Sequence, residues 1–190
     1  MGWLSVLGWV ALGLGFASAL AIVVLEVRRR EPSVMSVVHP VTALYLGPAW
    51  LWLYLRGRRA PVAHAVSHCG AGCTLGDIGG EWILFAVGVD AFGWELGLDF
   101  ALAWTLGILF QYATIGSLRR AVQADTLSIV AFEVGLFGWM ALARYVLFSS
   151  PPAVDTSGHW LVMQVGMILG FATAWPANVW LLRRGVKEPM

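Results

Sequence analysis

PVAHAVSHCGAGCTLGDIGGEW, residues 61–82, is the stretch that decides how this chain folds. It is polar and long enough for a helix, and it holds both cysteines and two of the four histidines. Residues four positions apart in a helix lie about 40° apart around the axis, so they form a slowly winding row. Cys69, Cys73, Asp77 and Glu81 form such a row, with five glycines among them that let neighbouring helices approach closely. Thiols and carboxylates are costly inside an apolar protein, so the row predicts a functional site.

The remainder of the chain is typical of an integral membrane protein. Of its 190 residues, 59% are hydrophobic and 12% are charged, against roughly 25% charged residues in soluble domains. Eleven tryptophans agree with aromatic belts at the two membrane interfaces. The net charge of +1 gives no indication of nucleic acid binding. We therefore expect a single transmembrane domain over residues 1–190, with the lipid bilayer as its partner; a homo-oligomer stays open.

Apolar segments separated by charged or proline-containing links predict an all-α bundle of six transmembrane helices. The first segment has no basic region before its apolar run, so we expect a retained helix and not a signal peptide. Kinks are expected at Pro48 and Pro176, because proline removes a backbone donor. Asp125 is expected to cap the fifth helix, and residues 90–99 to hold an acidic link. The predicted helices are residues 3–25, 34–55, 61–89, 100–118, 126–148 and 158–182.

Six crossings would place both termini on the same side of the membrane. Eight lysine and arginine residues then fall on that side, against three or four on the other. This excess favours cytoplasmic N- and C-termini, because cytoplasmic loops are enriched in positive charge. The three arginines at residues 28–30 argue the other way, since the first helix often dominates orientation.

Four candidate metal ligands fall within ten residues: His64, His68, Cys69 and Cys73. Thiolate and imidazole together suit soft or borderline ions such as copper(I), silver(I) or zinc. The two cysteines share one helix face and can reach one ion, whereas a disulfide across one helical turn would be strained. His68 lies about 100° from Cys69 around the helix, so it needs a local break or a partner helix. The alternative is that the buried cysteines act as small apolar residues.

Other polar and soft side chains extend this candidate site. Two carboxyl groups lie beyond the thiols on the same row and could balance charge or couple a proton. A histidine and two methionines follow at intervals of four in the last predicted helix, although methionine is also common in helical bundles. A glutamate in the fifth predicted helix needs a partner on another helix. The residues expected to relay or couple an ion are Asp77, Glu81, Glu133, His159, Met163 and Met167.

Four segments together resemble the bacterial membrane proteins of domain-of-unknown-function family 4396. They are HPVTALYLGPAWLWLYLR (39–56), HCGAGCTLGDIGGEW (68–82), ADTLSIVAFEVGLFGWMALAR (124–144) and MQVGMILGFATAWPANVWLLRRGVKEPM (163–190). The likeness spans about residues 34–190. It implies a small multi-pass protein of the bacterial cytoplasmic (inner) membrane and supplies no reaction.

The leading hypothesis is therefore the binding and translocation, or handling, of a soft metal ion, with copper(I) first and haem left open as another cofactor. A membrane thiol oxidoreductase using Cys69 and Cys73 is the first alternative. Redox dithiols usually adopt a Cys-X-X-Cys spacing, which differs from the spacing here. A non-catalytic assembly subunit is the second alternative. A transporter or metal-binding protein is favoured over an enzyme.

Overall fold

The computed structural model describes residues 2–29, 33–57, 60–89 and 91–187, and these residues form helices and short links without any strand. Four helical segments are long and apolar enough to cross a membrane, which confirms an all-α fold with helices of membrane-spanning length. The polar row lies on a further helix of 27 residues. The elements are α1 (Gly2–Arg29), α2 (Met35–Leu46), α3 (Pro48–Leu55), α4 (Pro61–Val87), α5 (Phe92–Ile115), α6 (Leu118–Leu142) with a π-helical turn (Ala143–Leu147), and α7 (Ser157–Arg183).

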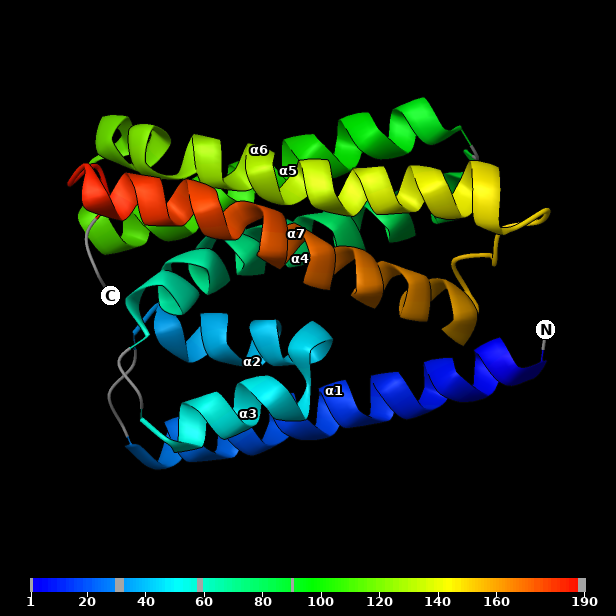
Figure 1. Cartoon of the computed structure of the whole chain (residues 1–190), viewed down its shortest axis with the longest axis horizontal. Coiled ribbons are helices and arrows are strands. Elements are labelled where there is room, and N and C mark those ends of the chain that lie inside the picture. The colour runs from blue at the N-terminus through cyan, green and yellow to red at the C-terminus, as the bar shows by residue number, and fades with distance from the viewer. Residues whose placement is uncertain (1, 30–32, 58–59, 90, 188–190) are drawn as a thin grey trace.

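The helix α4 occupies the middle of the bundle (Figure 1). It packs most extensively against α5 and also meets α7, α2 and α6. Two glycines allow the close approach to α5: a Cβ on Gly72 would overlap the backbone of Gly107, and one on Gly76 would overlap the backbone of Ala103. The glycines of the deciding stretch therefore bring the polar row next to its neighbours.

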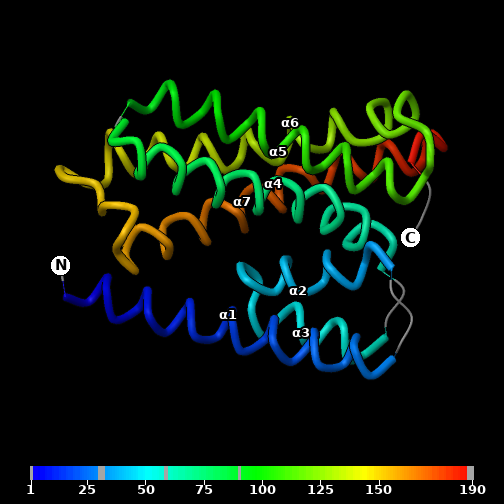
Figure 2. The backbone as a smooth tube through the Cα atoms, turned by 180° about the vertical axis from the view of Figure 1, so that it is seen from behind, coloured from blue at the N-terminus to red at the C-terminus, as the bar shows by residue number. Residues whose placement is uncertain are grey.

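The second predicted helix, residues 34–55, is two short antiparallel helices. The chain reverses at Gly47, whose φ is +54°, and Pro48 begins α3. Proline has no N–H to continue a helix, and glycine accepts the left-handed φ of the turn. Instead of the expected kink, α2 and α3 therefore form a hairpin that returns to the end from which it started (Figure 2). The other proline behaves differently, because α7 continues through Pro176 to Arg183.

The hairpin changes the relation between the two termini. At 12 and 8 residues, α2 and α3 would be about 18 Å and 12 Å long, too short to cross roughly 30 Å of hydrocarbon. The beginning of α1 and the end of α7 consequently lie at opposite ends of the bundle (Figure 1), and not at one end as six crossings would require. We refer to these as the N-terminal end and the C-terminal end of the bundle.

Two predicted links are also corrected. The helix α5 begins at Phe92, so Glu95 and Asp99 of the expected acidic link lie on this helix. The helix α6 begins at Leu118, so Asp125 lies two turns inside it and is not a cap. Asp99 and Asp125 are both buried, because they face other helices and not water. Residue 90 of the expected link lies outside the described residues.

Candidate functional site

The row on α4 runs through the interior of the bundle. Cys69, Cys73, Asp77 and Glu81 are all buried, with at most 5% of any residue exposed. Cys73 lies against Glu133 of α6, on the side of α4 that faces α6 and α7. A single helix thus lines up two thiols and two carboxyl groups along the long axis of the bundle.

The structure separates the two predicted histidine ligands from the thiols. His64 packs against the rings of His39 and Trp50, with centroids 5.6 Å and 6.3 Å away. His68 points toward α5 and α6. Cys69 and Cys73 stay together in one buried cluster. No group of three or more His, Cys, Asp or Glu residues in the described part of the chain is arranged to hold a metal ion.

A lysine from the C-terminal tail lies at the centre of a buried hydrogen-bond network near the C-terminal end. Lys187 Nζ donates to Asp125 Oδ1 at 2.5 Å and to Asn178 Oδ1 at 3.1 Å. Asn178 Nδ2 donates to Ser128 Oγ at 2.5 Å, and Ser128 Oγ donates to Cys69 Sγ at 2.8 Å. The other Asp125 oxygen, Oδ2, lies 3.7 Å from Nδ1 of His68. We call this the lysine cluster: His68, Cys69, Asp125, Ser128, Asn178 and Lys187.

A second buried group is made entirely of acids. Asp77 of α4, Asp99 of α5 and Glu133 of α6 interact electrostatically with one another, and we call them the acid trio. Both oxygens of Asp77, both of Glu133 and Oδ1 of Asp99 have no hydrogen-bond partner among the described residues. None of the three forms an ion pair with a lysine or arginine of the described chain. An apolar interior tolerates such carboxyl groups only when they hold protons or a bound cation.

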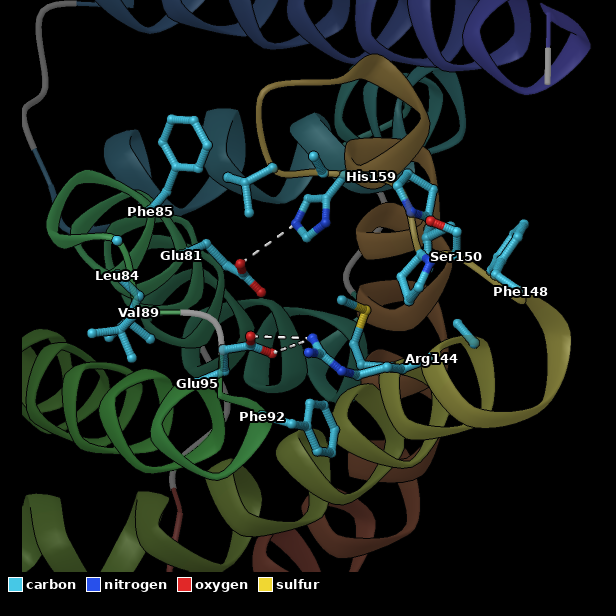
Figure 3. A pocket seen from close by; sticks show the side chains of 18 residues that line it. Glu81, Leu84, Phe85, Val89, Phe92, Glu95, Arg144, Phe148, Ser150 and His159 are labelled. Atoms are coloured by element: carbon cyan, nitrogen blue, oxygen red, sulfur yellow. Dashed lines mark hydrogen bonds and ion pairs between the residues drawn. The ribbon is translucent and has the colours of Figure 1, made fainter.

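A pocket of about 480 Å³ opens at the N-terminal end of the bundle (Figure 3). Glu81 and His159 both line it and lie side by side, with 3.6 Å between Oε2 and Nε2. Arg144, on the π-helical turn, donates to both carboxylate oxygens of Glu95 at 3.2 Å and 3.3 Å. Arg144 therefore pairs with Glu95 of α5. The pocket presents an acid, an imidazole and an ion pair at the end of the α4 row.

Soft side chains connect this pocket to the thiols. Met140 lines the large pocket and also a small void of about 10 Å³, which Asp99 and Met163 line as well. Met163 and Met167 are buried in the same cluster as the two cysteines. The two methionines of α7 thus pack against the α4 row. Gln164 has another role, since its Nε2 donates to Leu44 O at the tip of the α2–α3 hairpin at 2.8 Å.

Three functional candidates are not among the predicted site residues: Asp99, Asp125 and Lys187. The helical spacing of Asp99 and Asp125 relative to other residues of their helices could have indicated that both are buried. Asp99 continues a row with three buried residues at intervals of four, and Asp125 belongs to the buried face of α6. These rows are Asp99, Ala103, Gly107 and Gln111, and Ala121, Ala124, Asp125, Ser128, Ile129 and Phe132. No pattern in the sequence links Lys187 to its partners.

Comparison with known proteins gives one match. No curated protein and no solved structure shows a significant similarity to the chain. A family described as a domain of unknown function (DUF4396) matches residues 60–187, which is most of the chain. The matched range contains the α4 row, the acid trio and the lysine cluster, and it excludes α1, α2 and α3. The chain therefore belongs to the DUF4396 family.

Proposed function

We propose that this protein moves a soft metal ion through a membrane along α4, with copper(I) as the first candidate. One observation carries the proposal: soft ligand atoms follow one another from an open pocket to a buried pair of thiols. His159 and Met140 line the pocket, and Met163 lines the void behind it and packs with the two cysteines. Thiolate, thioether and imidazole are the side chains that select copper(I) over magnesium or calcium.

The thiol pair is the proposed deepest binding position. Cys69 and Cys73 are free and buried, and the hydroxyl of Tyr45 at the hairpin tip lies near both. Copper(I) needs only the two thiolates as strong ligands, and Met167 packs in the same cluster as a weaker one. His64 and His68, predicted as ligands, turn away from the thiols and take no part in this proposal.

The acid trio would balance the charge of the passing ion. A cation entering the buried region adds positive charge, and a carboxyl group that gives up its proton restores neutrality. Asp77 is suited to this because its oxygens have no hydrogen-bond partner among the described residues, and Glu133 is suited because it lies against Cys73. Ion movement would then be accompanied by proton movement.

The thiol oxidoreductase is less well supported. Exchange requires a thiolate that a partner can reach. Both cysteines are completely buried, and Cys69 donates its proton to Val66 O within its own helix at 3.2 Å. An assembly subunit without chemistry leaves the unpartnered acid trio unexplained.

We propose in addition that the protein resides in the bacterial cytoplasmic (inner) membrane with its C-terminal end in the cytoplasm. Because the hairpin returns to its starting end, the basic residues at the end of α1, after α3, at the start of α6 and at and after the end of α7 all lie at the C-terminal end of the bundle (Figure 1). Arg144 is the only lysine or arginine of the described chain at the other end. Positive charge concentrates on the cytoplasmic side of membrane proteins. The described basic residues at the C-terminal end are Arg28, Arg29, Arg56, Arg119, Arg120, Arg183, Arg184 and Lys187.

Transport can be measured in vesicles that contain purified protein and a lumenal copper(I) probe under reducing conditions. The change Cys73→Ala keeps the site apolar and removes one ligand. Loss of a residue that only supports a metal ligand typically costs roughly 10- to 100-fold in metal affinity or activity, so loss of the ligand itself should lower copper movement by at least this factor. Met163→Leu should give a smaller loss. Met35→Leu is the matched control, because Met35 packs in a separate cluster away from the thiols. Equal transport by wild type and Cys73→Ala would overturn the proposal.

Metal content tests the same site without transport. Protein purified without chelator should contain copper when cells are grown with it. Cys69→Ser and Cys73→Ser should each lose most of the metal, and the double variant should lose little more, because members of one site are not additive. Full metal content in both single variants would exclude the thiol pair as the binding position.

Orientation is tested with reporter fusions. A reporter that is active only outside the cytoplasmic membrane should be inactive when fused after Met190 and active when fused before Met1. The opposite pattern would reverse the proposed orientation, and equal signals from both fusions would contradict the placement of the two termini at opposite ends of the bundle.

A further inference from the structure

The ammonium group of Lys187 lies in a cage of oxygen atoms that three helices supply. Lys187 is the single lysine of the chain, and only 1% of it is exposed. Its Nζ donates to Ala65 O of α4 at 2.9 Å, Asp125 Oδ1 of α6 at 2.5 Å and Asn178 Oδ1 of α7 at 3.1 Å. We call these three acceptors the oxygen cage.

The lysine reaches the cage on a short tail that folds back over the end of α7. Gly185 has a φ of +66°, which suits glycine at a helix C-terminus. The amide of Gly185 donates to Leu182 O, and the amide of Val186 donates to Leu181 O, in the pattern of a Schellman motif. Release of Lys187 therefore needs only this last turn to open, while the long helices stay in place.

The oxygen cage is held by contacts that do not involve the lysine. Asn178 Nδ2 donates to Ser128 Oγ at 2.5 Å and to Ala174 O at 2.9 Å, which directs its carbonyl oxygen into the cage. Asp125 lies in the middle of α6 and is completely buried. If Lys187 leaves, a carboxylate remains fixed in a buried position without its counter-charge, and an uncompensated buried charge is strongly unfavourable.

We infer that the oxygen cage is a binding site for a small monovalent cation and that Lys187 occupies it as a tethered ammonium. The chemistry of the cage defines the ligand class. One carboxylate and two neutral carbonyl oxygens balance a single positive charge, and oxygen donors suit hard ions such as sodium or potassium. A soft metal ion would find no sulfur among the three acceptors. The inference stands independently of the proposed copper transport, because it concerns a different set of atoms and a different ion.

Chemical labelling of Lys187 in the wild-type protein tests whether a cation can replace the lysine in the oxygen cage. An amine-reactive reagent can label only this lysine and the N-terminal amine, so mass spectrometry of the C-terminal peptide reports its exposure directly. The protein is labelled in detergent at fixed pH with sodium, potassium or choline chloride at equal ionic strength. A peptide with an exposed lysine in the same tube is the reference.

A cation that takes the cage releases Lys187, so labelling should accelerate saturably with sodium or potassium and not with choline, which is too large. Because the cation and Lys187 exclude each other from one site, the acceleration follows mass action and should reach about 10-fold when the cation is at about ten times its dissociation constant. A structural lysine would be labelled at the same slow rate in all three salts, and that result would overturn the inference.

A variant separates the cage from a general effect of salt. Asp125→Asn removes the charge of the cage, so Lys187 should be labelled rapidly in choline, with no further acceleration by sodium or potassium. Asp155→Asn is the matched control, because Asp155 is exposed in the turn before α7, and it should behave like wild type. Acceleration by sodium or potassium that persists in Asp125→Asn would place the cation elsewhere and contradict the assignment.

Discussion

The lysine cluster and the acid trio are both buried in one bundle, yet only the lysine cluster carries its own counter-charge. Asp125 has Lys187 on one oxygen and His68 near the other. The acid trio has neither a basic partner nor hydrogen bonds for most of its oxygens among the described residues. A matched buried charge can serve architecture, whereas an unmatched one requires something from outside the chain, such as a proton or a metal ion. The lysine cluster thus takes its counter-charge from within the chain, whereas the acid trio must take one from outside.

The largest effect on stability is expected at Lys187. In choline buffer, Lys187→Met should lower the free energy of unfolding by about 3–5 kcal/mol, because it removes the lysine charge from buried Asp125 and leaves only His68 beside it. Asp125→Asn should be milder, since the freed lysine sits on a tail and can reach water. The double variant Lys187→Met/Asp125→Asn should regain most of the loss. Unfolding in detergent micelles, followed by circular dichroism, measures all three, and a double variant as unstable as Lys187→Met would show that the charge is not the cause.

A smaller effect is expected where the acid trio is assembled. Gly76→Ala places a Cβ against the backbone of Ala103 and should push α5 away from α4, at about 1–3 kcal/mol of stability. Gly79→Ala is the matched control, because its nearest neighbour would be a leucine side-chain atom at 4.0 Å. That change should be neutral or stabilise by up to about 1 kcal/mol, as alanine favours helix over glycine. Equal destabilisation by both changes would contradict the close approach at Gly76.

The smallest effect on stability, and the most informative one, is expected at Asp77. Neither of its oxygens has a partner to lose, so Asp77→Asn should change the free energy of unfolding by less than about 1 kcal/mol. The same variant should keep near-normal copper content and lose copper movement and its pH dependence in vesicles. Asp155→Asn again serves as the control. Normal movement in Asp77→Asn would remove the coupling role, and loss of the fold would make the acid trio a structural feature.

Much of the helical content and the row on α4 could be predicted from the sequence, because both depend on local spacing. The spacing of Cys69, Cys73, Asp77 and Glu81 is a property of one helix, so it does not depend on which helices pack around it. The reversal at Gly47 is different. A glycine followed by a proline permits either a kink or a turn, and the contact from Gln164 to Leu44 that supports the hairpin tip joins residues 120 positions apart.

The missed acids have a related explanation. The sequence predicts Asp99 in an acidic link and Asp125 at a helix N-cap, a position that aspartate favours. Both are buried by helices that are remote in sequence, and only their periodicity with neighbouring buried residues indicated this. Lys187 could not be predicted at all, since its position depends on where the last turn of α7 ends in space.

The α2–α3 hairpin also gives the molecule a tapered outline. At the narrow end α1 touches α7 directly, where Ser157 Oγ donates to Ser5 O at 3.0 Å. At the wide end α2 and α3 stand between α1 and α4 (Figures 1 and 2). In a bilayer, a body of this outline displaces more lipid from one leaflet than from the other. The stability of the fold then depends on the curvature of the membrane and on the lateral pressure within a single leaflet, which the lipids of that leaflet set.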